Sequence, residues 1–171
     1  FLHGNFLHLA MNCYALMPVG PLIEEVYGFR KFLVFYVGTG ITGAVATAWW
    51  HYPRMLGVGA SGAIFGLIGV AAMWGWRRGG SIGRCIQGQM LQWAVYGLVM
   101  GLFLHADNAA HLGGLVGGAI AGLLVDDRAP RHGVVARVWE GAAYLCVLLV
   151  VISFVMVALR YQATLDGFFS S

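Results

Sequence analysis

Six long apolar stretches with short connectors between them dominate the hydrophobic pattern of the chain. They cover about residues 5–27, 32–50, 56–76, 87–105, 109–125 and 141–159, and the connectors are rich in glycine, proline or charged residues. A helix needs roughly 20 mostly apolar residues to cross the hydrocarbon core of a bilayer. The pattern therefore predicts an all-α polytopic membrane protein, a helical bundle with six transmembrane helices in this chain.

Composition agrees with this fold class. Of the 171 residues, 60% are hydrophobic, 10% are charged and 26 are glycine, a residue that is commoner in membrane helices than in soluble ones. The three cysteines lie in separate stretches without the Cys/His spacing of a zinc site. We therefore expect the lipid bilayer as a partner, no metal or cofactor, and no nucleic acid.

Basic residues predict the orientation of the stretches in the membrane. Eight follow the first, third and fifth stretches, and two fall on the other side. The eight are Arg30, Lys31, Arg77, Arg78, Arg84, Arg128, Arg131 and Arg137, against Arg54 and Arg160. Because cytoplasmic loops carry an excess of Lys and Arg, the first, third and fifth stretches should run from the outside to the cytoplasm.

One serine, Ser61, is flanked by small residues near the start of the third stretch. A serine hydroxyl attacks carbonyls well only when a base takes its proton and hydrogen-bond donors are positioned to bind the oxyanion. His111 in the fifth stretch is the candidate base, because an ionisable residue inside a span is costly and is by default a functional hypothesis. His8 and Asn12 in the first stretch are candidate donors.

Depth in the membrane links these residues. Asn12 lies 18 residues before Arg30, Ser61 lies 16 before Arg77, and His111 lies 15 before Asp126. With a rise of about 1.5 Å per residue, the three side chains stand roughly 22–27 Å above the inner boundary of a roughly 30 Å core. The spacing therefore predicts one shared layer near the outer face, with His8 one turn above Asn12 on the same helix face.

Small residues predict how the third and fifth stretches approach one another. Three glycines follow His111 on its own helix face, namely Gly114, Gly118 and Gly122. The third stretch offers Gly62 and Gly66 beside Ser61, so the two helices can pack closely. Phe65, one turn after Ser61, is placed to pack on the imidazole.

Other polar residues receive supporting roles. Asp107 lies four residues before His111, towards the membrane exit, and we interpret it as a loop-capping residue and the site as a Ser-His dyad. Glu24, at the inner end of the first stretch, is assigned a structural role. His3 either braces a preceding loop or is an interfacial histidine without a specific role.

Together these motifs resemble the rhomboid family of intramembrane serine proteases. Four segments carry the resemblance: the spaced His, His and Asn of His3, His8 and Asn12; the Glu-x-x-x-Gly end from Glu24 to Gly28; the GxSG motif from Gly59 to Gly62; and the AHxxG motif from Ala110 to Gly114.

The resemblance implies a role for each matching residue. Ser61 would attack the scissile carbonyl, and His111 would act as general base and then as general acid. The oxyanion would be held by the Ser61 backbone N–H with the side chains of His8 and Asn12. Structural support is assigned to His3, Glu24, Gly59, Gly62, Phe65 and Gly114. The family cleaves membrane-anchored substrates within or near their spans, so transmembrane proteins would be the partners.

The resemblance also implies a division of the chain. The family's catalytic core has six helices, and the first precedes the helix of His8 and Asn12. Residues 1–127 would form the rhomboid catalytic core without its first helix, 128–140 a cytoplasmic linker, and 141–171 an additional C-terminal transmembrane helix with a short outer tail. We expect a bacterial inner membrane, with the active site near its outer face.

Other function classes fit the residues less well. The chain has no HExxH motif for zinc, and Ala63 fills the place of the last glycine in the GxSxG elbow of α/β-hydrolases. A channel or transporter would be favoured by acidic or paired charges deep in the bundle. The remaining alternative is a non-catalytic rhomboid-like protein that binds membrane clients. Such relatives typically lack the Ser or the His, whereas this chain has both.

Overall fold

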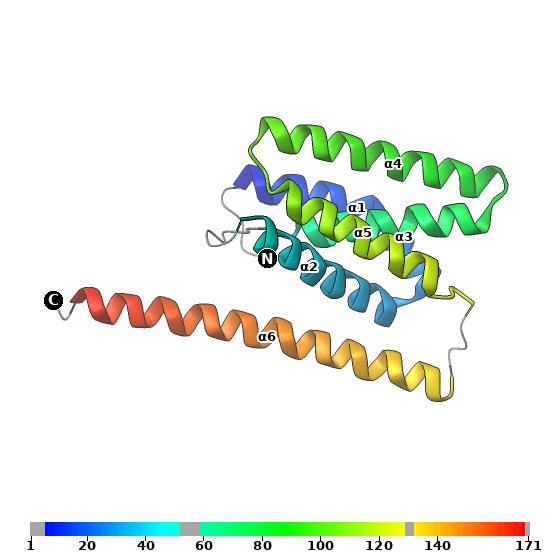
Figure 1. The fold of residues 1–171 in the computed structure, drawn as a ribbon. Coiled ribbons are helices and arrows are strands. Elements are labelled where there is room, and N and C mark those ends of the chain that lie inside the picture. The colour runs from blue at the N-terminus through cyan, green and yellow to red at the C-terminus, as the bar shows by residue number, and fades with distance from the viewer. Residues whose placement is uncertain (1–5, 52–58, 129–131, 170–171) are drawn as a thin grey trace.

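The computed structural model describes residues 6–51, 59–128 and 132–169, and the side chains among them as far as residue 161. Six helices account for most of this part of the chain: α1 (Phe6–Tyr27), α2 (Phe29–His51), α3 (Ser61–Arg78), α4 (Gly80–Phe103), α5 (Asn108–Leu124) and α6 (Val134–Phe169). Helices α1, α3 and α5 run one way and α2, α4 and α6 the other (Figure 1). The prediction of an all-α polytopic bundle is confirmed.

Helix length and hydropathy vary more than the sequence pattern predicts. Within the described residues, three helical segments are long and apolar enough to cross a membrane: Phe6–Tyr27, Phe29–His51 and Val134–Tyr161. Helix α5 is a shorter apolar helix. Helix α3 differs from these helices because it is surrounded by other helices of the protein. Most of its residues are buried, and it packs against α1, α2, α4 and α5.

Helices α3 and α5 approach so closely that glycine is required where they cross. A Cβ on Gly114 would overlap the carbonyl oxygen of Gly62, and one on Gly118 would overlap that of Gly66. Gly122 lies in the same row, where a Cβ would be 2.7 Å from the Val70 oxygen. The predicted pairing of two small-residue faces is confirmed. Backbone contact of this kind holds membrane helices together where lipid removes the hydrophobic driving force.

Threonine hydroxyls join α2 to this central pair. The Thr39 hydroxyl donates to the Phe35 carbonyl at 2.7 Å and lies 3.3 Å from the Ala63 carbonyl of α3. The Thr42 hydroxyl lies 2.9 Å from its own helix at Thr39 and 3.0 Å from the Gly113 carbonyl of α5. Such polar contacts between apolar helices stabilise their association.

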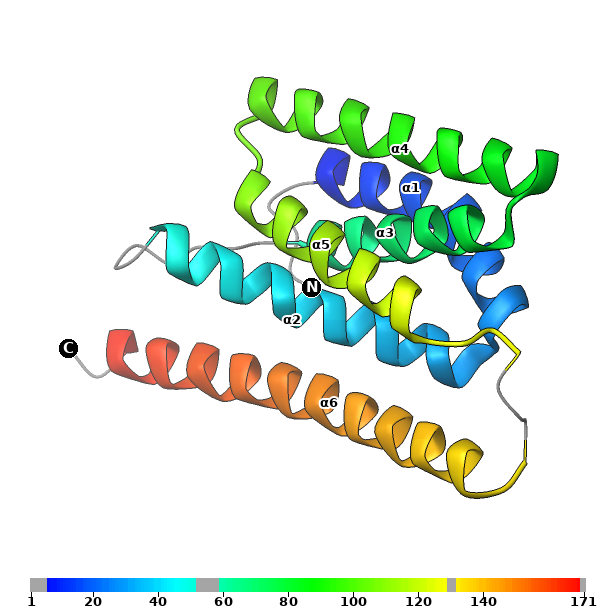
Figure 2. The same cartoon turned by 45° about the vertical axis from the view of Figure 1, so that its right-hand side comes forward.

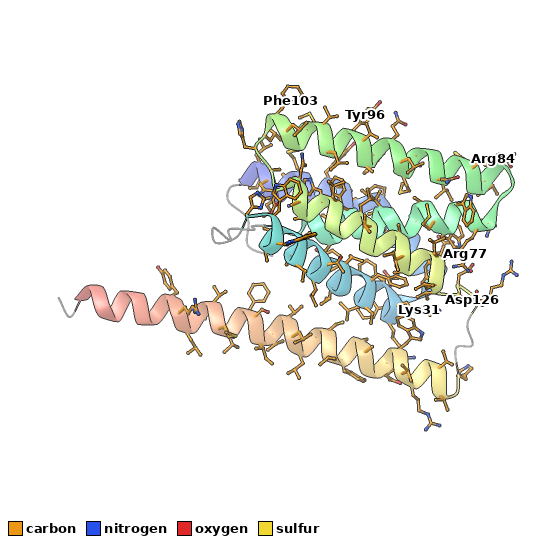
Figure 3. The ribbon with its side chains drawn as sticks, in the orientation of Figure 1. Lys31, Arg77, Arg84, Tyr96, Phe103 and Asp126 are labelled. Atoms are coloured by element: carbon orange, nitrogen blue, oxygen red, sulfur yellow. The ribbon has the colours of Figure 1, made fainter. Side chains whose placement is uncertain are left out.

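Charged side chains gather at the end of the bundle where α5 finishes (Figure 3). Arg77 of α3 donates to the carbonyls of Gly122 and Val125 at 2.8 and 2.6 Å, and Lys31 of α2 donates to that of Asp126 at 2.7 Å. The last carbonyls of a helix lack intrahelical partners and carry partial negative charge. Cations from two neighbouring helices therefore satisfy and stabilise the end of α5.

Helix α6 begins at Val134, inside the segment 128–140 that we expected to be a linker. Its first turns are held by α2: Arg30 pairs with Glu140 at 3.1 Å, and the Phe35 and Trp139 rings meet edge to face at 6.0 Å. These contacts explain why the helix starts before its apolar stretch. Among the described helices α6 packs on α2, and as far as Tyr161 most of its later apolar side chains are exposed (Figure 2).

The crossing of α3 and α5 gives the first prediction. Substitution Gly118→Ala should lower the free energy of unfolding by about 1–3 kcal/mol, because the added methyl pushes two backbones apart. The matched control is Gly88→Ala on α4, where a Cβ would meet nothing within 4 Å. The control should keep or raise stability. Unfolding in SDS followed by circular dichroism measures both, and equal midpoints would contradict the proposed tightness of the crossing.

The charged end gives a prediction of pH dependence. Burial raises the pKa of the Asp127 carboxyl, but the hydrogen bond from the Trp74 indole and the charges of Arg77 and Arg128 lower it below its ordinary value of 3.8. A lowered folded-state pKa stabilises the fold above the unfolded value, and this contribution is lost as the pH falls through the folded value. Asp127→Asn should therefore be less stable than the parent at neutral pH. The difference should shrink as the pH falls below 3.8 and disappear once the pH is below the lowered folded-state pKa.

Chemical unfolding of both proteins across this pH range checks the prediction. The control is Asp126→Asn, because that carboxylate is 61% exposed and lies farther from Arg77, at 3.8 Å. It should lose less stability. A constant difference between parent and Asp127→Asn at every pH would show that the carboxylate charge does not matter.

Candidate functional site

Ser61 is the first residue of α3, directly after a sharp bend of the backbone. Gly59 makes this bend with a φ of +116°, in the region where a side chain is strained. The N–H groups at the start of a helix have no intrahelical acceptor and form its positive end. Ser61 therefore presents its hydroxyl at a helix terminus that favours negative charge.

Helix α1 brings both candidate donors to the bend. A Cβ on Gly59 would lie 2.8 Å from the His8 ring atoms Cε1 and Nε2 and 3.5 Å from the Asn12 amide nitrogen. Asn12 is 8% exposed, and its Nδ2 has no hydrogen-bond partner among the described residues. An unsatisfied buried donor costs stability. Glycine at position 59 is thus required both by its φ and by the closeness of His8.

His111 lies in the first turn of α5 and is 5% exposed. The Phe65 ring stacks on its imidazole with centroids 4.2 Å apart and planes at 7°, as the sequence predicts. Gly97 of α4 makes room for this pair, since a Cβ there would lie 2.5 Å from Phe65 Cζ. Because Phe65 is one turn beyond Ser61 on α3, the stack places His111 beside the helix that carries the serine.

The residues before His111 have separate roles. Asp107 caps α5 by accepting a hydrogen bond from the Ala110 N–H at 3.1 Å, and its second oxygen accepts one from Thr47 at 2.5 Å. The loop-capping interpretation of Asp107 is confirmed. Asn108 instead contacts the imidazole, with Oδ1 3.0 Å from His111 Nδ1. Sequence analysis missed Asn108, although its spacing of three residues from His111 on a helix is a signal for such contact.

The remaining predicted residues lie at different distances from this centre. Gly62 and Gly114 form the crossing of α3 and α5 described above. Glu24 is exposed at the other end of α1, beside a cavity of about 560 Å³, and His3 falls outside the described residues. No hydrogen bond joins Ser61 to His111 in the part of the chain that the structure describes. Catalytic hydrogen bonds are often long before substrate binds and tighten in the complex.

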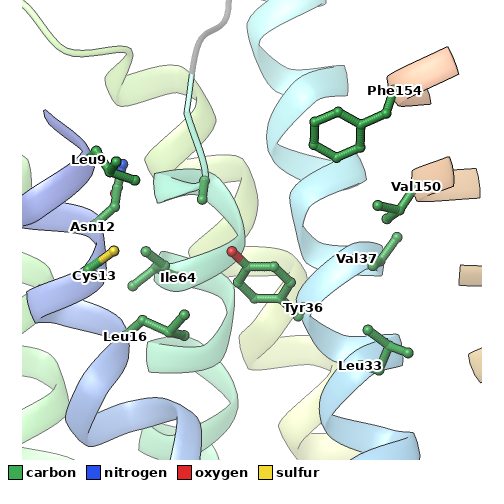
Figure 4. A pocket seen from close by; sticks show the side chains of 11 residues that line it. Leu9, Asn12, Cys13, Leu16, Leu33, Tyr36, Val37, Ile64, Val150 and Phe154 are labelled. Atoms are coloured by element: carbon green, nitrogen blue, oxygen red, sulfur yellow. The ribbon is translucent and has the colours of Figure 1, made fainter. Parts of the chain in front are cut away.

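An apolar cavity of about 340 Å³ lies beside the Asn12 side chain (Figure 4). Its walls come from α1, α2, α3 and α6, and include Leu16, Tyr36, Ile64 and Phe154. Asn12 is the polar residue of α1 that faces this space. The cavity therefore has mostly apolar walls and, at Asn12, an amide donor without a partner among the described residues.

Taken together, a hydroxyl, an imidazole and two potential donors come from three helices at one end of the bundle. Within residues 6–51, 59–128 and 132–161, no group of three His, Cys, Asp or Glu side chains is arranged to hold a metal ion. The chemistry that these residues themselves offer is nucleophilic attack with proton transfer and oxyanion stabilisation.

Comparison with known proteins agrees with the motifs. Rhomboid protease GluP of Bacillus subtilis is 37% identical over 122 residues, which are 70% of this chain and 24% of that protein. Rhomboid protease AarA of Providencia stuartii is 32% identical over 145 residues (70% and 51%), and Rhomboid-like protease 2 of Toxoplasma gondii is 32% identical over 135 (74% and 46%). The chain thus spans about a quarter to a half of these relatives.

A family model described as the rhomboid domain matches residues 1–128, which contain every candidate residue of the site. The match includes α1 to α5 and ends before α6. This chain belongs to the rhomboid family.

Proposed function

We propose that this protein is an intramembrane serine endopeptidase that cleaves membrane-anchored proteins within or near their transmembrane segments. The observation that carries the proposal is the bend at Gly59. This bend lies against His8 and Asn12 on one side and leads into Ser61 and Phe65 on the other. Phe65, one turn beyond Ser61, stacks on the imidazole of His111. The proposed nucleophile, base and oxyanion donors thus come from three helices, as acyl transfer requires.

The proposed reaction follows from these positions. His111 Nε2 takes the proton of Ser61 as its Oγ bonds to the scissile carbonyl carbon, and the carbonyl oxygen becomes an oxyanion. The Ser61 N–H, the Asn12 amide and the His8 ring stabilise that charge. When the carbon–nitrogen bond breaks, His111 gives its proton to the leaving amine. Water then attacks the acyl-enzyme by the same route, and Ser61 is restored.

The orientation of the protein follows from its charges. Lys31, at the start of α2 beside Arg30, and Arg77, at the end of α3, lie at the opposite end of the bundle from the start of α3, where Ser61 stands (Figures 1 and 3). Because basic residues mark the cytoplasmic side, the active site would lie near the outer face, where water enters. A bacterial inner membrane remains the predicted location, although relatives also come from Toxoplasma gondii and Arabidopsis thaliana. The bilayer and transmembrane substrates would be the partners.

The first test is labelling of the full-length protein in liposomes with a fluorophosphonate, a probe that bonds to activated serines. The parent should be labelled, and Ser61→Ala and His111→Ala should lose labelling because each removes part of the dyad. Ser153→Ala is the control, since that hydroxyl donates to its own helix at 2.8 Å on the exposed part of α6. An unlabelled but folded parent would favour the alternative, a rhomboid-like protein that binds membrane clients without cleaving them.

The role of Asn12 gives a second prediction. Asn12→Ala should lower the rate constant of fluorophosphonate labelling by about 100-fold, because the phosphonyl oxygen loses a donor. The control is Met11→Ala on the same helix, since Met11 is 40% exposed. Its labelling should match that of the parent. If Asn12→Ala reacts as fast as Met11→Ala while both remain folded, Asn12 does not stabilise the oxyanion.

A further inference from the structure

The Asn108 amide bridges two helices and the candidate base. It is the first residue of α5, and its Nδ2 donates to the Leu98 carbonyl of α4 at 3.1 Å. Its Oδ1 lies 3.0 Å from His111 Nδ1. Both polar atoms of the Asn108 amide therefore have a partner: the nitrogen contacts a backbone carbonyl and the oxygen contacts the imidazole.

These two partners determine which imidazole nitrogen carries the proton. A carbonyl oxygen only accepts hydrogen bonds, so the Leu98 oxygen requires the NH₂ group of Asn108 to face it. The amide oxygen then faces His111, and it also only accepts. Nδ1 of His111 must therefore be the donor, which leaves Nε2 of the neutral ring with its lone pair free.

We propose that Asn108 is a positioning residue that holds His111 with its proton on Nδ1, so that Nε2 is the base for Ser61. The proposal rests on the proposed function of this site. During the reaction the Nδ1 proton stays in its hydrogen bond to Asn108. Only the proton of the serine hydroxyl moves, first to Nε2 and then to the leaving amine, and the ring returns to its starting tautomer.

Gly101 of α4 makes the space that this arrangement needs. A Cβ at position 101 would overlap Asn108 Oδ1 and lie 3.1 Å from Cγ and 3.3 Å from Nδ2. These are the atoms of the amide that contacts His111. Gly101 is buried, so the added methyl has no alternative position in solvent. A side chain at Gly101 would therefore displace Asn108 and loosen its hold on the imidazole.

The neighbouring carboxylate does not fulfil this role. Asp107 uses its oxygens for the Ala110 N–H and Thr47, as described above. Asp107 and His8 are the charged or titratable groups that act on His111 among the described residues. A neutral amide suits a ring that is 5% exposed, because an ionised carboxylate buried beside it would cost far more free energy.

The test is the pH dependence of fluorophosphonate labelling by the full-length protein in liposomes. Asn108→Ala should lower the rate constant about 10-fold or more, because the ring is no longer held in one tautomer. Asn108→Asp keeps an acceptor but adds a charge that stabilises the imidazolium. Its acid limb should therefore move to higher pH, with labelling above that limb faster than in Asn108→Ala.

A purely structural role for Asn108 would give another result. Labelling would then fall in proportion to the folded fraction, and the midpoint of the acid limb would not move. That outcome, or labelling of Asn108→Ala at the parent rate, overturns the proposal.

Gly101 allows a second test that keeps the asparagine. Gly101→Ala should slow labelling as Asn108→Ala does, and the two together should be no slower than Asn108→Ala alone, because they act through one contact. Gly88→Ala on the same helix is the matched control, since nothing lies within 4 Å of a Cβ there. Additive losses would overturn the link between Gly101 and Asn108.

A spectroscopic readout separates this proposal from the proposed function. In the Ser61→Ala variant, ¹⁵N NMR of the His111 ring should show one tautomer with the proton on Nδ1. Further substitution of Asn108 by Ala should give a mixture of tautomers. This measurement does not need activity, so it holds even if the parent is never labelled. A ring with its proton on Nε2 in the presence of Asn108 would refute the assignment.

Discussion

The backbone contact between α3 and α5 is the constraint on which the site depends. Gly114 and Gly118 lie so close to the carbonyls of Gly62 and Gly66 that even a methyl group would not fit. Ser61 begins α3 and His111 lies in the first turn of α5. The depth and spacing of the two side chains are therefore set by rigid helices. A loop would fix these side chains less precisely, and a catalytic site tolerates only positional errors well below about 1 Å.

The polar groups at the end of α5 and near the start of α3 differ in whether they have hydrogen-bond partners. Where α5 ends, Arg77 and Lys31 satisfy carbonyls that would otherwise be orphaned in a membrane protein. Where α3 begins, the Asn12 amide is buried without a partner in the described residues. An unsatisfied donor of this kind destabilises the fold by about 1–3 kcal/mol. The carbonyls where α5 ends are therefore satisfied, whereas the Asn12 donor near the start of α3 is not. The Tyr27 hydroxyl, at the end of α1 beside Lys31, is also buried without a partner among the described residues.

Much of this arrangement can be predicted from sequence, because it follows from spacing. The lengths of the apolar stretches predict the helices, and the spacing of the glycines predicts the close crossing of α3 and α5. The position of Asp107 before His111 predicts its capping role. The contact of Phe65 with His111 follows from the same helix geometry. Sequence did not predict the start of α6 at Val134, because contacts with α2 rather than hydropathy extend that helix. It also missed Asn108, whose bond to Leu98 depends on how two helices meet.

Burial decides what kind of group can orient the imidazole of His111. A carboxylate beside an imidazole is useful where water or other donors can offset its charge, and Asp107 has such partners at the start of α5. His111 itself is 5% exposed and covered by the face of Phe65. There an amide can fix the direction of the ring by hydrogen bonding alone, since it carries no net charge to desolvate. Its own orientation must then be fixed by a second partner, which is the backbone of α4 at Leu98. The orientation that we propose for the His111 ring thus depends on α4 as well as on α5.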